Sequence, residues 1–138
     1  MPTAVAAVAS GIDERLDEVL EAAELRARLR RFDYESERIA ARHGLTPRRY
    51  LLLLMIKGAP DGSERSTVTQ LAERLRLERH SVAELVGRAE AAGLIEREQS
   101  ADDRRVAYLQ LTEEGERRLA GAFGDHAAER TLLTELLP

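Results

Sequence analysis

Residues 67–93, TVTQLAERLRLERHSVAELVGRAEAAG, contain two short helical patterns separated by a turn. Thr67 followed three residues later by Gln70 has the form of a capping box, in which two residues cap the start of a helix reciprocally. Apolar residues at helical spacing continue this helix to about Leu75, and a second set predicts a helix over about 79–92. Two short helices joined by a tight turn are typical of a helix-turn-helix.

After Gly93 the helical spacing gives way to two segments that resemble strands. Residues 94–98 and 106–111 are short and rich in apolar residues, and the polar stretch 99–105 separates them. A hairpin that directly follows a helix-turn-helix predicts a winged helix. In such units the second helix lies in the major groove of DNA and the wing reaches a neighbouring groove. Thr112 is the expected N-cap of the next helix.

Amphipathic segments flank this unit on both sides. Apolar residues at three- and four-residue spacing predict a long helix over 12–44 and a buried helix over 47–57. A helix of about 30 residues spans roughly 45 Å, which is longer than the core of a small domain, so part of its apolar stripe is expected to face another chain. A helix that is solvated, or that folds onto its own chain, is the alternative. The carboxyl end carries a further apolar set, Leu132, Leu133, Leu136 and Leu137.

The expected fold class is therefore mainly α, a winged helix with a helix-turn-helix and a two-stranded β-wing, flanked by N- and C-terminal dimerisation helices. Within one domain overall, we expect a flexible N-terminal tail over residues 1–11, helical dimerisation elements over 12–44 and 113–138, and a winged helix-turn-helix DNA-binding unit over 45–112.

Composition narrows the class of protein. The chain has 138 residues, of which 43% are hydrophobic and 33% charged, as in a globular protein of about one domain. Its longest apolar run, 50–56, is far shorter than the roughly 20 residues of a membrane span, and no secretory signal is recognisable. Cytoplasmic localisation is expected. The absence of cysteine excludes disulfides, thiolate metal sites and thiol redox switches.

The second helix of the pair offers hydrogen-bonding side chains for DNA. Its polar side carries Arg79, His80, Ser81, Glu84 and Arg88. The first three stand at the amino end, where backbone N–H groups and the helix dipole also favour a phosphate. Glu84 can accept from a cytosine amino group or repel phosphate. An ordinary solvated helix face is the alternative interpretation.

Residues 103–112, DRRVAYLQLT, fit the pattern DxRxxxxxLT, which resembles the wing signature of the MarR (multiple antibiotic resistance regulator) family. The blocks LTP at 45–47, LAERL at 71–75 and AGLI at 92–95 also resemble that family, and the similarity covers about residues 45–119. The resemblance implies a homodimeric transcriptional regulator, usually a repressor. Its affinity for a palindromic operator would be lowered by a small, often phenolic or anionic, ligand.

The resemblance also implies roles in the wing. Arg105 would enter the minor groove, Asp103 would orient it by a salt bridge, and Arg104 would lie at the tip near phosphate. A narrow minor groove concentrates negative potential and so attracts a guanidinium. The alternative is that Asp103 and Arg105 only brace the hairpin. Ala83 and Glu84 depart from the polar or basic residues that many members carry, so no operator sequence can be inferred.

By the same resemblance, an effector pocket would lie between the long helix, the following helix and the winged unit. The candidate ligand-binding residues are Tyr34, Arg38, Arg42, His43, Arg49 and Tyr50. An arginine and a tyrosine hydroxyl would suit an anionic ring. Each also has a structural alternative, because a tyrosine at the end of an apolar run is usually core and an arginine between helices usually pairs with a carboxylate.

Other functions have less support in the sequence. The three histidines, His43, His80 and His126, have no metal-ligand spacing, and no glycine-rich phosphate loop is present, so we expect no metal, no cofactor and no catalytic residues. The main competing function is a winged-helix adaptor that binds protein instead of DNA, since the fold hosts both functions. The net charge of −4 favours the adaptor, whereas the arginines of the second helix and the wing favour DNA.

Overall fold

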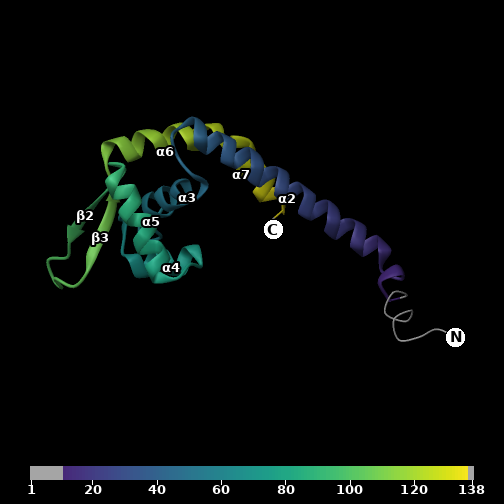
Figure 1. The fold of residues 1–138 in the computed structure, drawn as a ribbon, viewed down its shortest axis with the longest axis horizontal. Helices are drawn as coiled ribbons and strands as arrows, with labels where there is room; N and C mark the ends of the chain where they lie inside the picture. Colours follow the sequence, from purple (N-terminus) through teal and green to yellow (C-terminus); the bar gives the residue numbers. More distant parts are fainter. Residues whose placement is uncertain (1–10, 137–138) are drawn as a thin grey trace. The chain divides into compact units, whose positions relative to one another are not determined.

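A computed structural model describes residues 11–136 of the chain. Within that range it contains helices α2 (Leu16–Arg42), α3 (Pro47–Lys57), α4 (Val68–Leu75), α5 (Arg79–Ala91), α6 (Glu113–Asp125) and α7 (Ala127–Leu136), and strands β1 (Arg65–Ser66), β2 (Ile95–Gln99) and β3 (Ala107–Leu111) (Figure 1). The expected order of helices and wing is confirmed. The described residues fall into two compact units, 11–35 and 36–136, which are described separately.

In the first unit, residues 11–35 are helical apart from a turn at residues 14–15, and they expose the apolar stripe that the sequence predicts. The exposed large side chains of the stripe are Ile12, Leu16, Val19, Leu20 and Leu25. Asp17 and Glu18 occupy the first turn of α2, where the positive end of the helix dipole stabilises acidic side chains. The stripe therefore has no core of its own to cover it within residues 11–35.

The second unit is built around α3, in which residues 50–56 are apolar on all sides. Thr46 accepts a hydrogen bond from the backbone N–H of Arg49 at 3.2 Å, and Pro47 occupies the first turn, where no N–H is needed. Tyr50, Leu52, Leu53 and Ile56 of this helix are buried. Fully burying an aliphatic side chain of this size stabilises a fold by about 1.5–3 kcal/mol, so α3 supplies much of the core.

Ion pairs at the surface join the end of α3 to its neighbours. Lys57, the only lysine of the chain, binds Glu64 at 3.0 Å and Glu116 of α6 at 2.7 Å. These contacts raise the pKa of Lys57. Exposed pairs of this kind contribute little to stability, so they direct the packing of the elements more than they strengthen it.

Helices α4 and α5 form the predicted helix-turn-helix. Thr67 and Gln70 make both bonds of the capping box, at 3.2 and 2.9 Å. Arg76 then takes a left-handed conformation, with φ 56°, and ends α4 without a glycine. The apolar faces of the two helices join the core of the unit through the buried residues Leu71, Ala72, Val82, Val86 and Ala89.

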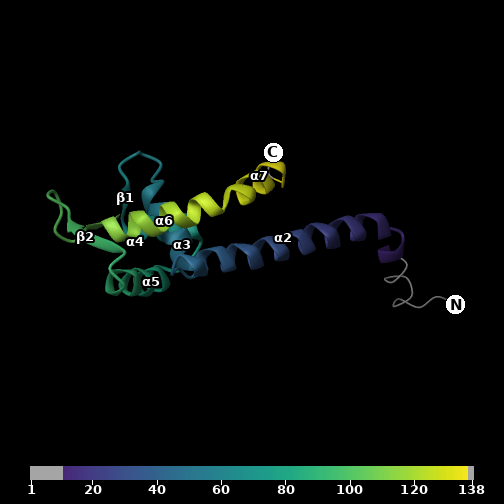
Figure 2. The same cartoon turned by 90° about the horizontal axis from the view of Figure 1, so that it is seen from above.

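Strands β2 and β3 form the wing as an antiparallel pair, and the short strand β1 adds to β3 on its other side (Figure 2). The pair register places Ile95 opposite Leu111 and Gln99 opposite Ala107. The residue pattern does not predict β1, because two residues are too few to show an alternation. The wing therefore belongs to a three-stranded sheet, with the order β1-β3-β2.

The carboxyl-terminal segment consists of two helices. Thr112 caps α6 as predicted, and the chain turns at His126 before α7. His126 is buried and stacks on the ring of Tyr50 at 4.4 Å between centroids. Leu132 and Leu133 are half-buried, whereas the side chain of Leu136, Leu137 and residues 1–10 of the expected tail lie outside the described part of the chain.

Replacing Thr67 by alanine removes the side-chain half of the capping box. We expect Thr67→Ala to lower the free energy of unfolding by about 1 kcal/mol in urea denaturation, because the start of α4 loses the partner of one backbone N–H. Thr69→Ala, an exposed position in the first turn of the same helix, serves as the control and should change stability by less than about 0.5 kcal/mol. Equal effects of the two variants would contradict the capping role.

Candidate nucleic-acid interface

Helix α5 presents the predicted polar face to solvent. Arg79, His80, Glu84 and Arg88 are exposed and Ser81 is half-buried, while Val82, Val86 and Ala89 face the core. Glu78 at the N-cap makes no side-chain cap hydrogen bond. The first-turn N–H groups of α5 are therefore not blocked by a capping side chain, as a helix that receives a phosphate at its amino end requires.

The tip of the wing holds its arginine in a defined position. Asp103 accepts bonds from the Arg105 backbone N–H at 3.0 Å and from the Arg105 Nε at 3.2 Å. These bonds lower the pKa of Asp103, so it stays ionised. The Arg105 side chain is nevertheless 91% exposed, and Arg104 beside it is exposed as well. The predicted ion pair is thus present, and it leaves most of the guanidinium available to a partner.

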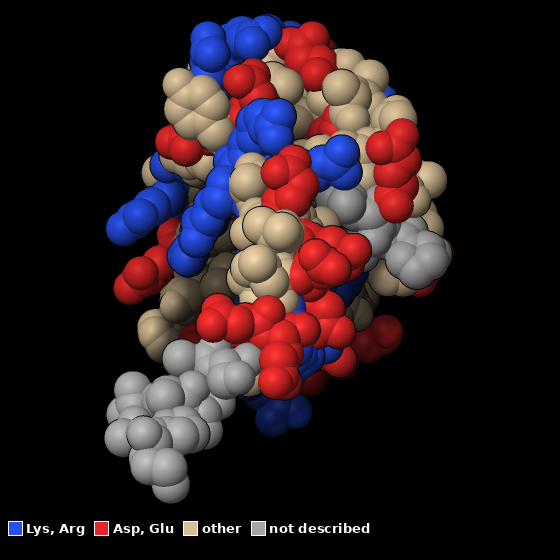
Figure 3. All heavy atoms as spheres, turned by 90° about the vertical axis from the view of Figure 1, so that its right-hand side faces the viewer, with Lys and Arg blue, Asp and Glu red and all other residues tan. Residues whose placement is uncertain are grey.

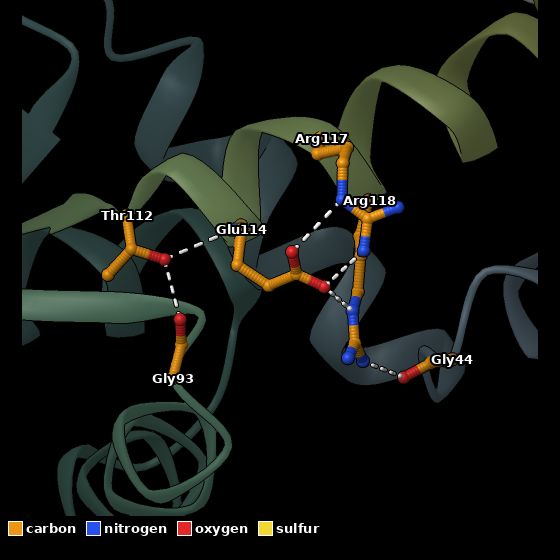
Figure 4. Close-up of polar contacts among 7 residues, drawn as sticks. Gly44, Gly93, Thr112, Glu114, Arg117 and Arg118 are labelled. Atoms are coloured by element: carbon orange, nitrogen blue, oxygen red, sulfur yellow. Dashed lines mark hydrogen bonds and ion pairs between the residues drawn. The ribbon is translucent and has the colours of Figure 1, made fainter.

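The base of the wing is joined to the start of α6 by Thr112 (Figure 4). Its hydroxyl donates to the carbonyl oxygen of Gly93 at 2.6 Å and accepts from the N–H of Gly115 at 3.1 Å. Its backbone N–H donates to the carbonyl oxygen of Leu94 at 3.0 Å. A side chain at Gly115 would collide with that same carbonyl group, so only glycine permits this close approach.

In the same first turn of α6, Glu114 binds two arginines that lie one turn further along the helix (Figure 4). Arg117 and Arg118 both donate to its carboxylate, which lowers the pKa of Glu114 from 4.5 to about 2. Arg118 also donates to the carbonyl oxygen of Gly44 at 3.2 Å. Gly44 has a φ of 71°, and its carbonyl lies just beyond the end of α2. Arg118 therefore links α6 to the end of α2.

A pocket of about 310 Å³ opens beside this link. It is lined by Arg42, His43, Gly44, Arg117 and Arg118. His43 binds Asp125 at 2.7 Å, which lowers the pKa of that carboxyl. Four of the five lining residues carry basic side chains, so the pocket has the composition to receive a small anion.

The structure brings only two of the six candidate effector residues, Arg42 and His43, into this pocket. Tyr50 is a buried core residue whose ring packs on His126, and this burial, together with Glu129, raises its pKa. Arg49 is half-buried in the first turn of α3, and Arg38 is exposed on α2. Tyr34 belongs to the other unit and is 60% exposed.

Two arginines of the pocket, Arg117 and Arg118, are absent from the candidates that the sequence suggested. Their spacing of three and four residues from Glu114 is the signal that would have found an ion-pair cluster on one helix face. The contacts of His126 were missed as well. Its ring nitrogens lie 2.7 Å from the carbonyl oxygen of Ala122 and 3.0 Å from the hydroxyl of Ser36. The residue pattern does not predict the contact between His126 and Ser36, because Ser36 lies 90 residues away in the chain.

The part of the chain that the structure describes contains neither a metal-binding cluster nor a membrane-spanning helix. No group of three or more His, Cys, Asp or Glu side chains is placed to hold a metal ion among residues 11–136. None of the described helices combines the length and the apolar character that crossing a bilayer requires.

The helix-turn-helix, the antiparallel wing and the exposed basic side chains on both define a winged-helix protein. Residues 43–106 match the model of the MarR family. It is 33% identical over 88 residues to the HTH-type transcriptional regulator MhqR of Bacillus subtilis (strain 168), a match that covers 64% of this chain and 58% of that relative. The chain thus spans a little over half of the length of the curated relative.

Solved structures show the same fold over most of the chain. The MarR family transcription regulator SP03579 superposes with a TM-score of 0.73 at 25% identity, covering 93% of this chain and 83% of that one. A mutant MarR from E. coli, solved in complex with operator DNA, superposes with a TM-score of 0.66 at 16% identity, covering 88% of this chain and 97% of that one. The second likeness concerns the fold alone.

The low pKa of Glu114 predicts a pH-dependent contribution to stability. Because its pKa is lowered on folding, the ionised carboxylate stabilises the folded state above about pH 4.5, and this stabilisation is lost as pH falls toward 2. Glu114→Gln should therefore be less stable than the wild type in urea denaturation at about pH 7, and the difference should shrink by about pH 3. Glu113→Gln, an exposed neighbour in the same first turn, is the control and should show no such convergence.

Proposed function

We propose that this chain is a sequence-specific DNA-binding transcriptional regulator, acting as a homodimeric repressor at a palindromic operator. The observation that carries the proposal is the wing tip, where Asp103 holds an almost fully exposed Arg105 in one orientation. A guanidinium restrained in this way has less entropy to lose when it enters a minor groove. The fold shared with a MarR solved on operator DNA supports the same function.

In this proposal the two exposed elements divide the contacts with DNA. Helix α5 lies in the major groove, with Arg79, His80 and Ser81 near phosphates or base edges at its amino end. Arg88, more than two turns further on, reaches the backbone, and Glu84 accepts from a cytosine or excludes other bases. Arg105 enters the neighbouring minor groove, and Arg104 binds phosphate at the wing tip.

Because the chain is acidic overall, its contacts with DNA would have to come from a few basic side chains in α5 and the wing. The net charge of the chain is −4, so no overall positive field draws DNA toward it. On the face that Figure 3 draws, the described residues carry both acidic and basic side chains. The affinity for DNA would therefore depend on the arginines of α5 and of the wing.

A protein that binds chromosomal DNA in this way would act in the cytoplasm.

The second copy of the chain is proposed from the exposed apolar stripe of α2. The stripe includes Leu16, Val19, Leu20 and Leu25, and burying it against a partner would remove apolar surface from water. The carboxyl-terminal helix α7 supplies a further amphipathic segment with Leu132 and Leu133 half-buried. A symmetric dimer would present two α5 helices to half-sites about 10 base pairs apart, or a multiple of that spacing.

Release from DNA by a small phenolic or anionic ligand is proposed at the basic pocket beside α6. A ligand carboxylate or phenolate there would compete with Glu114 for Arg117 and Arg118. Glu114 lies two residues after Thr112, whose hydroxyl bonds to Gly93 at the base of the wing. A shift of the first turn of α6 would therefore be transmitted to the wing.

A protein-binding adaptor is the second candidate function. The excess of acidic residues and the exposed Glu84 in the middle of the α5 face favour it, because both oppose a polyanion. An adaptor would bind duplex DNA weakly or not at all. Salt dependence separates the two functions, since contacts with phosphates release counterions and contacts with a protein surface do not show that steep dependence.

The test of the proposed function is selection of bound duplexes from a random library with the purified chain. We expect enrichment of an inverted repeat, because a symmetric dimer reads two equivalent half-sites. The affinity for the enriched duplex should fall steeply as salt rises, with a slope of about −0.9 per phosphate contact. No enrichment with folded protein would refute the DNA-binding function and favour the adaptor.

Arg105 is the residue whose removal tests the wing. Arg105→Ala should weaken binding to the selected duplex by about 1–3 kcal/mol and relax the preference for one base pair beneath the wing, because a groove contact is lost. Arg104→Ala is the comparison variant, and it should weaken binding to all duplexes similarly and reduce the salt slope by about one contact. Unchanged affinity of a folded Arg105→Ala protein would show that Asp103 and Arg105 only brace the hairpin.

A further inference from the structure

The wing extends beyond the hydrophobic core. In β2 the core-facing row consists of Ile95, Arg97 and Gln99, which pair with Leu111, Leu109 and Ala107 of β3. Only the first of the three, Ile95, is buried, and the strand is exposed from Glu96 onward. On β3, Leu109 opposite Arg97 is still buried, so apolar packing holds the β3 side of the wing to this level. On the β2 side, polar contacts are left to restrain the strand beyond Ile95.

The polar contact that joins this row to helix α5 is an ion pair between Arg97 and Glu90. Arg97 Nη2 donates to Glu90 Oε1 at 2.7 Å, and its Nε lies 3.5 Å from Oε2. Glu90 occupies the last turn of α5, and the strand begins only five residues later, after the turn at Gly93. The two-point geometry restrains both the distance and the angle between the helix and the strand, as a single-point contact would not.

The opposite face of the wing has its own contacts, and they do not reach α5. Gln110 donates to Glu96 at 3.0 Å across the strands, and the Arg65 guanidinium lies 4.3 Å from the centre of the Tyr108 ring. These contacts stiffen the three-stranded sheet itself. The pair between Arg97 and Glu90 instead links the sheet to the helix that carries the other half of the candidate interface.

We propose that Arg97 and Glu90 are positioning residues of the nucleic-acid interface, and that their ion pair sets the angle between α5 and the wing so that both reach their grooves together. The inference rests on the proposed DNA-binding function. Neither residue needs to touch DNA. They act through Arg105, which lies at the tip of the wing. If the wing were mobile, binding to DNA would cost the entropy of ordering it, and the ion pair reduces that cost.

The neutral variant Glu90→Gln separates this role from simple electrostatics. Removing a carboxylate makes the chain less negative, so a purely electrostatic effect would tighten binding to DNA. Positioning predicts the opposite sign. We expect Glu90→Gln to weaken binding to the selected duplex about two- to fivefold, the range that corresponds to an exposed ion pair. Its melting temperature should stay close to that of the wild type.

Matched variants complete the test. Glu98→Gln makes the same change of charge on the adjoining strand, at a position opposite Tyr108 and outside the core-facing row, and it should leave binding unchanged or tighter. The exchanged pair Glu90→Arg with Arg97→Glu restores an ion pair at equal net charge and should recover affinity to within about twofold. In an Arg105→Ala background, Glu90→Gln should have no additional effect, because the pair acts through that side chain.

A second measurement follows the wing without DNA. Backbone order parameters from NMR relaxation for residues 100–106 should fall in Glu90→Gln and stay at wild-type values in Glu98→Gln. If Glu90→Gln binds the duplex as tightly as Glu98→Gln and leaves these order parameters unchanged, the positioning role is wrong while the proposed function stands. If the wild type binds no duplex, the proposed function fails and this inference fails with it.

Discussion

Burial of helix α3 is the constraint on which the second unit depends. Leu52, Leu53 and Ile56 have no exposed surface, and α4, α5, α6 and the sheet all pack around the helix that carries them. Because residues 50–56 of α3 are apolar on all sides, each neighbour turns an apolar face toward them and a polar face outward. The polar faces of α5 and the wing, which carry the candidate DNA contacts, are therefore a consequence of the same burial.

The route from the basic pocket to the wing is short and continuous. Arg118 contacts both Gly44 and Glu114, and Thr112, two residues before Glu114, contacts both Gly93 and Gly115. The close approach of Gly115 to the carbonyl group of Leu94 leaves no room for the first turn of α6 to slide past the wing. In the proposed function, this contact would pass a displacement of the turn to the base of the wing.

Local patterns in the sequence were enough to establish the order of elements and their caps. Spacing of apolar residues, the Thr67 and Gln70 capping box and the N-cap at Thr112 are local signals, and each of them appears where it was predicted. The ion pair of Asp103 and Arg105, two residues apart, was implied by the resemblance to the MarR wing signature, and it is present. Interactions between neighbours in the chain depend on local geometry alone, so a pattern of residues suffices to predict them.

Which distant residues meet depends instead on the packing of the whole unit. Strand β1 exists because β3 offers it a partner 43 to 45 positions along the chain, and Tyr50 is a core residue because His126 stacks on it. Arg42 and His43 share a pocket with Arg117 and Arg118 through the packing of α6 on the α2–α3 turn. Contacts of this kind arise because several helices are buried together. The spacing of apolar residues along one segment therefore does not predict them.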